Sequence, residues 1–141
     1  MAKDHRYQHH PPAFHCAKRQ LSHLRGGAGE LRDHRIAVGL YSVVPDTGKV
    51  VRTHRVELDL SGASTPVPEL VEIPVADLVL VNDDDLTYCL MGLDQDSLHF
   101  ITHHIADIED PMARSLCWSA AWQMTRNGEM KARDFLTLVA Q

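Results

Sequence analysis

The sequence predicts an α+β protein, with a short antiparallel, β-sandwich-like sheet followed by an incomplete α-helical array. Three observations predict this fold class. Apolar and polar residues alternate over much of residues 34–60, which is the period of half-buried strands. Residues 78–93 contain two short apolar runs around an acidic turn. From residue 94 onward, apolar residues recur every three or four positions, as they do in a helix.

Residues 1–33 differ in composition from the rest, and we expect them to form a disordered tail. They are basic and rich in histidine, and Pro11-Pro12 and Gly26-Gly27-Ala28-Gly29 interrupt regular structure. A short helix over residues 17–24 is the one element that this segment favours. The glycine run lacks the Lys-Ser/Thr pair of a phosphate-binding loop and follows no strand, so we interpret it as a linker.

A β-sandwich domain is predicted over residues 34–94, and it begins with a hairpin. Apolar residues alternate over residues 36–41, and Pro45-Asp46-Thr47-Gly48 supplies a turn. The alternation resumes over residues 49–60. It changes phase near Thr53-His54, which indicates a β-bulge.

The second half of the β domain contains an edge element and two central strands. Two prolines restrict residues 65–73 to an edge strand or an extended connection. Residues 78–81 and 86–93 are apolar on both faces, which is typical of buried strands. Asn82-Asp83-Asp84-Asp85 between them predicts a tight hairpin turn, because Asn and Asp tolerate turn dihedrals.

Residues 95–141 are predicted to be the first helices of a C-terminal helical domain. Asp94 or Asp96 can cap the first helix. Asp110-Pro111 is a strong start for the second helix, which Asn127-Gly128 ends. A third helix is predicted over residues 130–139. Three of its side chains are expected to face inward, namely Phe135, Leu136 and Val139.

The second helix carries a second apolar stripe formed by Trp118 and Trp122. A helix with two apolar faces needs neighbours on both sides, and three helices leave part of that surface uncovered. We therefore expect the chain to stop within a helical array. The alternative is a stand-alone sheet-and-helix module that presents this exposed helical surface to a partner protein.

Composition excludes several classes of function. A formal net charge of -5 argues against a nucleic-acid-binding protein. The first residues lack the apolar core of a secretory signal, and no run of 18 apolar residues predicts a membrane span. The three cysteines form no CxxC pair, which favours a reducing compartment. We expect a cytoplasmic protein without membrane or nucleic-acid partners.

Two histidines, His99 and His103, lie four residues apart on one face of the first predicted helix, which is the spacing of zinc ligands. A zinc peptidase of the HExxH type also needs Glu directly after the first His, and Phe100 occupies that position. We interpret the two histidines as a solvated surface pair. The spacing of possible ligands in the tail does not match a tetrahedral metal site either. These possible ligands are His5, His9, His10, His15 and Cys16.

Four acidic residues crowd the junction between sheet and helices, namely Asp83, Asp85, Asp94 and Asp96. A calcium loop of the EF-hand type starting at Asp83 would need Gly at its sixth position and Glu at its twelfth. Tyr88 and Asp94 stand there instead, so we interpret the acids as turn and cap residues.

Cys89 and Cys117 lie among apolar residues, which predicts core positions rather than nucleophiles. Trp118 and Trp122 are likewise predicted to pack in a core rather than to bind a ligand. The sequence offers no Ser-His-Asp arrangement.

Six runs of residues, in a fixed order and spacing, carry a resemblance to a known family. The most specific are Asn-Asp-Asp-Asp-Leu-Thr-Tyr at residues 82–88 and the Asp-Pro…Leu-Cys-Trp run at residues 110–118. Over residues 31–141 the chain resembles bacterial, especially actinobacterial, aminopeptidase N. The six runs lie at residues 31–41, 67–70, 80–88, 93–94, 110–118 and 124–126.

The resemblance implies a fold and a function. Full-length members are large zinc aminopeptidases with an N-terminal β domain, a thermolysin-like catalytic domain, a small β-sandwich and a C-terminal helical domain. This chain resembles the β-sandwich and the first helices. It lacks the HExxH motif and the Gly-x-Met-Glu-Asn motif. No catalytic, cofactor-binding or metal residue is therefore carried over, and zinc and peptide substrates belong to the full-length family. We expect a truncated, non-catalytic portion without activity alone.

Overall fold

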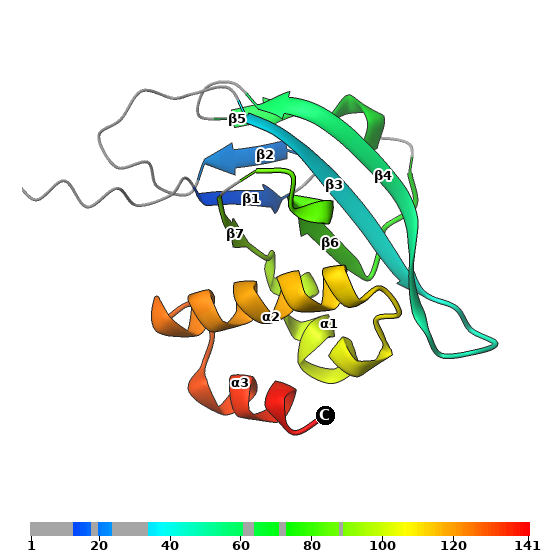
Figure 1. Ribbon diagram of the computed structural model, residues 1–141, viewed down its shortest axis with the longest axis vertical. Coiled ribbons are helices and arrows are strands. Elements are labelled where there is room, and N and C mark those ends of the chain that lie inside the picture. The colour runs from blue at the N-terminus through cyan, green and yellow to red at the C-terminus, as the bar shows by residue number, and fades with distance from the viewer. Residues whose placement is uncertain (1–12, 18–19, 24–33, 61–63, 71–72, 88) are drawn as a thin grey trace, which may run out of the picture.

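The computed structural model places two small β-sheets on one side of the molecule and three helices on the other (Figure 1). Within the part of the chain that is described, no helix is long and apolar enough to cross a membrane. The structure describes residues 13–17, 20–23, 34–60, 64–70, 73–87 and 89–141.

The central strand of the first sheet is β3 (His34–Val43), which lies between β4 (Val50–Leu60) and β6 (Leu78–Val81). Both pairings are antiparallel. Because β3 is central, its residues 36–41 are buried on both faces. The hairpin between β3 and β4 is confirmed, and Gly48 supplies the positive φ of 69° in its turn.

The predicted β-bulge is also confirmed. The register between β3 and β4 shifts between Leu40, which pairs with His54, and Tyr41, which pairs with Arg52. Thr53 is thus the extra residue on β4, and its hydroxyl donates to the Leu40 carbonyl at 3.2 Å.

The second sheet has the order β5-β2-β1-β7. It contains β1 (Ala13–Ala17), β2 (Gln20–His23), β5 (Ser64–Pro66) and β7 (Leu90–Gly92). The helix predicted over residues 17–24 is wrong, because Ala17 and Gln20–His23 lie in strands whose partners come from distant parts of the chain. The prediction of an edge strand is confirmed at β5, which a 3₁₀ turn at Pro68–Leu70 follows. The other tail residues lie outside the described part.

The predicted hairpin at residues 82–85 is wrong. The strand β6 pairs with β3, whereas β7 pairs in parallel with β1 of the other sheet. The strand expected over residues 86–93 is reduced to β7. The prediction that these two strands are central is wrong, because β6 and β7 lie at the edges of their sheets. The physical reason is the connecting turn, because Asn82, Asp84 and Asp85 all have left-handed φ angles of 58°, 63° and 54°. This backbone carries the chain from one sheet to the other.

Two of the helices begin at the residues that the sequence predicts. Helix α1 (Gln95–His104) is capped by Asp94, whose carboxylate accepts from the Ser97 N–H at 2.9 Å. Helix α2 (Pro111–Arg126) is capped by Asp110, which accepts from the Met112 N–H at 3.0 Å. Asn127 ends α2, as expected.

The inward face of α3 (Ala132–Val139) differs from the prediction. Leu138 is buried and Phe135 packs against the core, whereas Leu136 and Val139 are 66% and 50% exposed. The third helix packs on α1 and α2 through the Leu138 side. The side chains of Leu136 and Val139 lie away from that contact, so the prediction that both face inward is wrong.

Strands and helices share one core. It combines Tyr41, Leu78 and Leu80 of the first sheet with Ile101 of α1 and Cys117 of α2. A smaller cluster lies on the opposite face of β3 and contains Ile36, Val38, Leu40, Leu60, Val67, Leu70 and Val81. The side of β3 that faces the helices therefore presents residues 37, 39 and 41. The domain boundary at residue 94 stays a prediction.

Candidate functional site

A buried carboxylate occupies the joint between the first sheet and the helices. Asp83 lies in the turn after β6, and its side chain has no exposed surface. Its Oδ1 accepts from the Tyr41 hydroxyl at 2.7 Å, and its Oδ2 accepts from Arg52 Nη1 at 2.8 Å. The carboxylate thus binds side chains from β3 and β4 at once.

Gly39 makes room for this carboxylate. A Cβ atom at position 39 would lie 2.2 Å from Asp83 Oδ2 and 2.8 Å from Tyr41 Cε2. Both distances are far below van der Waals contact, so any side chain here would displace the buried ion pair. The alternation along β3 places Gly39 on the same face as Tyr41.

The turn itself is held by Asn82, which is 1% exposed. Its Nδ2 donates to the Thr87 carbonyl at 2.8 Å, and its Oδ1 accepts from the Thr87 N–H at 3.2 Å. These two bonds close a loop around the left-handed residues. They offset the strain of positive φ angles, which Asn and Asp tolerate better than most residues.

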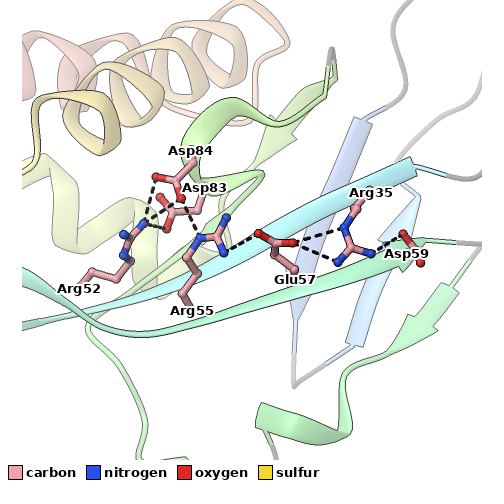
Figure 2. Close-up of polar contacts among 7 residues, drawn as sticks. All are labelled: Arg35, Arg52, Arg55, Glu57, Asp59, Asp83 and Asp84. Carbon is pink, nitrogen blue, oxygen red and sulfur yellow. Dashed lines mark hydrogen bonds and ion pairs between the residues drawn. The ribbon is translucent and has the colours of Figure 1, made fainter.

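Further ion pairs run from Asp83 outward along the sheet (Figure 2). Asp84 accepts from Arg52 at 3.0 Å and from Arg55 Nε at 2.7 Å. Arg55 also pairs with Glu57 at 2.7 Å. Arg35 then bridges Glu57 at 3.1 Å and Asp59 at 3.2 Å. We call this set the Asp83 network; its members are Arg35, Arg52, Arg55, Glu57, Asp59, Asp83 and Asp84.

The two ends of the Asp83 network contribute unequally to the free energy of unfolding. The side chains of Arg35 and Asp59 are 59% and 69% exposed, so water screens their attraction and the pair contributes little. Asp83 is fully buried and must be paired to stay charged there. The buried end therefore stabilises the contact between the first sheet and the turn after β6. The exposed end covers the solvent-facing side of β4.

Tyr41, Arg52 and Asp84 hold fixed protonation states near neutral pH. Burial, and then the hydrogen bond to Asp83, raises the pKa of the Tyr41 hydroxyl, which stays a donor. The hydrogen bond to Asp83 raises the pKa of Arg52 despite the opposing effect of burial. Burial opposes ionisation of Asp84, but hydrogen bonds from Arg52 and Arg55 outweigh it and lower its pKa. Such an arrangement is suited to holding structure rather than to transferring protons.

The predicted site residues do not converge on one site, although His99 and His103 are neighbours on α1. His99 and His103 are exposed on α1, and Asp96 is exposed near the start of that helix. Asp94 is the N-cap of α1, as expected. Within the described ranges, no three His, Cys, Asp or Glu side chains are grouped so that they could hold a metal ion. The histidines of residues 1–12 and the Gly26–Gly29 run lie outside those ranges.

The two cysteines with described side chains pack as predicted. Cys117 is fully buried and Cys89 is partly buried, and neither forms a disulfide. Burial raises the pKa of each thiol to about 12. A thiol with so high a pKa is a weak nucleophile, because the thiolate is the reactive form.

The tryptophans separate into two environments. Trp118 packs against the core and meets the Phe135 ring edge-on, with centroids 6.1 Å apart. Trp122 also contacts Phe135, at 5.5 Å, but it is 52% exposed. The core role predicted for both holds fully for Trp118 alone.

Sequence reasoning missed the ion pair between Arg52 and Asp83. A signal was available in the small residues Ala37 and Gly39, which leave space on one face of a central strand. The acidic run at residues 82–85 by itself predicts a hairpin turn and a cap region. Its pairing with arginines of β4 depends on the bulge and on the left-handed turn, which composition alone does not reveal.

The substitution Asp84→Asn is expected to weaken the fold at neutral pH but not in acid. The pKa of Asp84 is lower in the folded chain, so its stabilisation is present above the unfolded value of about 3.9 and is lost as pH falls through the folded pKa. Asn keeps the side-chain shape and tolerates the left-handed backbone. Urea unfolding at neutral pH should show a loss of about 1 kcal/mol at most. The two proteins should converge once the pH lies below the folded pKa of Asp84. A difference that persists there would contradict this role of the charge.

Comparisons with known proteins match this part of the chain. Residues 78–141 match the family model of the ERAP1-like C-terminal domain, so the match begins at β6 and includes the Asp83 turn and the helices. The chain is also similar to aminopeptidase N of Streptomyces lividans, with 47% identity over 116 residues, or 81% of this chain. The chain spans 13% of the length of that relative.

Proposed function

Because the chain belongs to the aminopeptidase N family over the segment that it covers, we propose that this segment is a non-catalytic brace within a peptidase of that family. The resemblance predicted from the sequence is confirmed. In the proposal, the sheet and helices form one rigid support for the parts of the longer protein that cut peptides. The reaction of the full-length family would be zinc-assisted removal of N-terminal residues from peptides.

The observation that carries this proposal is the buried pairing of Asp83 with Tyr41 and Arg52. It fastens β3 and β4 to the turn that leads toward the helices. That turn, but neither strand, lies within residues 78–141, which match the family model. Rigid positioning of this kind supports a catalytic domain without supplying a reacting group. The chain also lacks the HExxH and Gly-x-Met-Glu-Asn motifs that catalysis in this family requires.

The purified chain is expected not to hydrolyse a leucine or alanine anilide. The residues that would bind zinc and the substrate amino group in this family have no counterpart in the sequence. The measurement is release of the aniline chromophore, with a full-length aminopeptidase N as positive control. Turnover by this chain that a chelator abolishes would contradict the proposal.

A second candidate function rests on exposed apolar surface. Trp122, Leu136 and Val139 are each at least half exposed and come from the α2–α3 pair. We propose that this surface packs against another protein segment, which in the longer relatives would be a part that this chain does not contain. Gel filtration with an apolar dye tests the proposal. A monomer that binds little dye would contradict it, whereas strong dye binding or association supports it.

The expected location is a further part of the proposal. Cys89 and Cys117 are free thiols, as is usual in a reducing compartment. A cytoplasmic location therefore stays a prediction, which fractionation of the source cells would test.

A further inference from the structure

Two exposed imidazoles lie side by side on α1. His99 and His103 occupy successive turns of one helix face, and their ring centroids are 5.1 Å apart. Two imidazoles bound to one tetrahedral ion, with metal–nitrogen bonds of about 2.0–2.1 Å, have ring centres about 5 Å apart. The observed separation therefore allows both rings to bind one ion with little movement.

One hydrogen bond also fixes which ring nitrogen of His103 is free to bind a metal ion. The Nδ1 of His103 lies 3.2 Å from the His99 carbonyl oxygen. A carbonyl oxygen can only accept, so Nδ1 carries the proton and the lone pair is left on Nε2. Metal-ligating histidines commonly have this arrangement, in which the second nitrogen donates to a carbonyl or carboxylate and fixes the ring.

The neighbouring residues favour a cation at this place. Both imidazoles are exposed, so an ion can reach them without opening the fold. Asp96, also exposed, lies three residues before His99 and adds negative charge along the same side of the helix. The next imidazole, that of His104, is paired with Asp107 at 3.1 Å and stacks on Phe100, so it belongs to a different arrangement.

We propose that His99 and His103 form a two-histidine site for a divalent transition-metal ion, whose remaining positions are filled by water. Imidazole ligands select zinc, nickel and copper over magnesium and calcium, and copper should bind most tightly. The ion would join two turns of α1, and binding to the folded helix would stabilise it by mass action. The inference is independent of the proposed bracing role.

Isothermal titration calorimetry of the 141-residue chain with zinc chloride tests this site. The reference protein carries alanine at the five tail histidines, His5, His9, His10, His15 and His23, so that no tail imidazole contributes. One zinc ion should bind, and His99→Ala or His103→Ala should weaken binding at least tenfold. The matched control His104→Ala, on the adjacent position of the same helix, should leave the affinity unchanged.

Thermal unfolding gives a second readout that does not depend on heats of binding. Saturating zinc should raise Tm of the reference protein by about 3 °C or more, and magnesium should not. The doubly substituted His99→Ala, His103→Ala protein should show no zinc-dependent shift. Equal zinc binding by the reference and the double variant, or no binding by either at millimolar zinc, would overturn the proposal.

Discussion

Replacing Asp83 by alanine is expected to lower the free energy of unfolding by about 3–5 kcal/mol. The change removes a fully buried carboxylate and leaves the Tyr41 hydroxyl without its acceptor. Arg52 keeps only its contact with Asp84. A loss of this size is a large fraction of the total stability of a typical domain, which is about 5–15 kcal/mol. Urea unfolding followed by circular dichroism measures it.

The matched control is Asp59→Ala, which removes an acid at the exposed end of the same network. Its side chain is 69% exposed, so the expected loss is within about 1 kcal/mol. If Asp83→Ala proves too unstable to purify, Tyr41→Phe removes one hydrogen bond to the same carboxylate and should cost about 1–2 kcal/mol. Equal losses for the substitutions at 83 and 59 would contradict the central place of Asp83.

The second large effect is expected for Gly39→Ala, with a loss of about 3 kcal/mol. The added methyl group would meet the Asp83 carboxylate at 2.2 Å, and the central strand cannot move without disturbing both neighbouring strands. Gly48→Ala is the contrast, because a Cβ there meets nothing within 4 Å and the cost is only that of the positive φ, about 1 kcal/mol.

A double-mutant cycle separates this clash from any general intolerance of β3. If the methyl group acts by displacing the carboxylate, Gly39→Ala should cost much less in a chain that already carries Asp83→Ala. Independent, additive losses in chemical denaturation would show that the two positions do not interact, contrary to the geometry.

Sequence patterns over a few residues predicted the features that depend on residues close together in the chain. The caps at Asp94 and Asp110 and the end of α2 at Asn127 depend on neighbouring residues. The bulge at Thr53 lies within a hairpin whose two strands follow each other closely in the chain. Periodicity and turn chemistry therefore suffice for them.

Predictions failed for features that depend on contacts between residues far apart in the chain. Gln20–His23 forms a strand because β1 and β5 pair with it, and the β6 and β7 strands separate into different sheets. The side of α3 that faces inward depends on where α1 and α2 lie. The Asp83 network likewise joins residues more than 30 positions apart, such as Arg52 and Asp83. No short-range pattern reports such pairings.

The Asp83 network fastens β3 and β4 to the turn near which α2 packs, so the sheet and the helices should open as one cooperative unit. Amide hydrogen exchange measures this most directly, because it reports the opening free energy of each segment. In the unaltered chain, amides of β3 and α2 should share the highest protection, and in Tyr41→Phe or Asp83→Ala both should lose protection by the same amount. Loss confined to β3, with α2 protected as before, would contradict the claim.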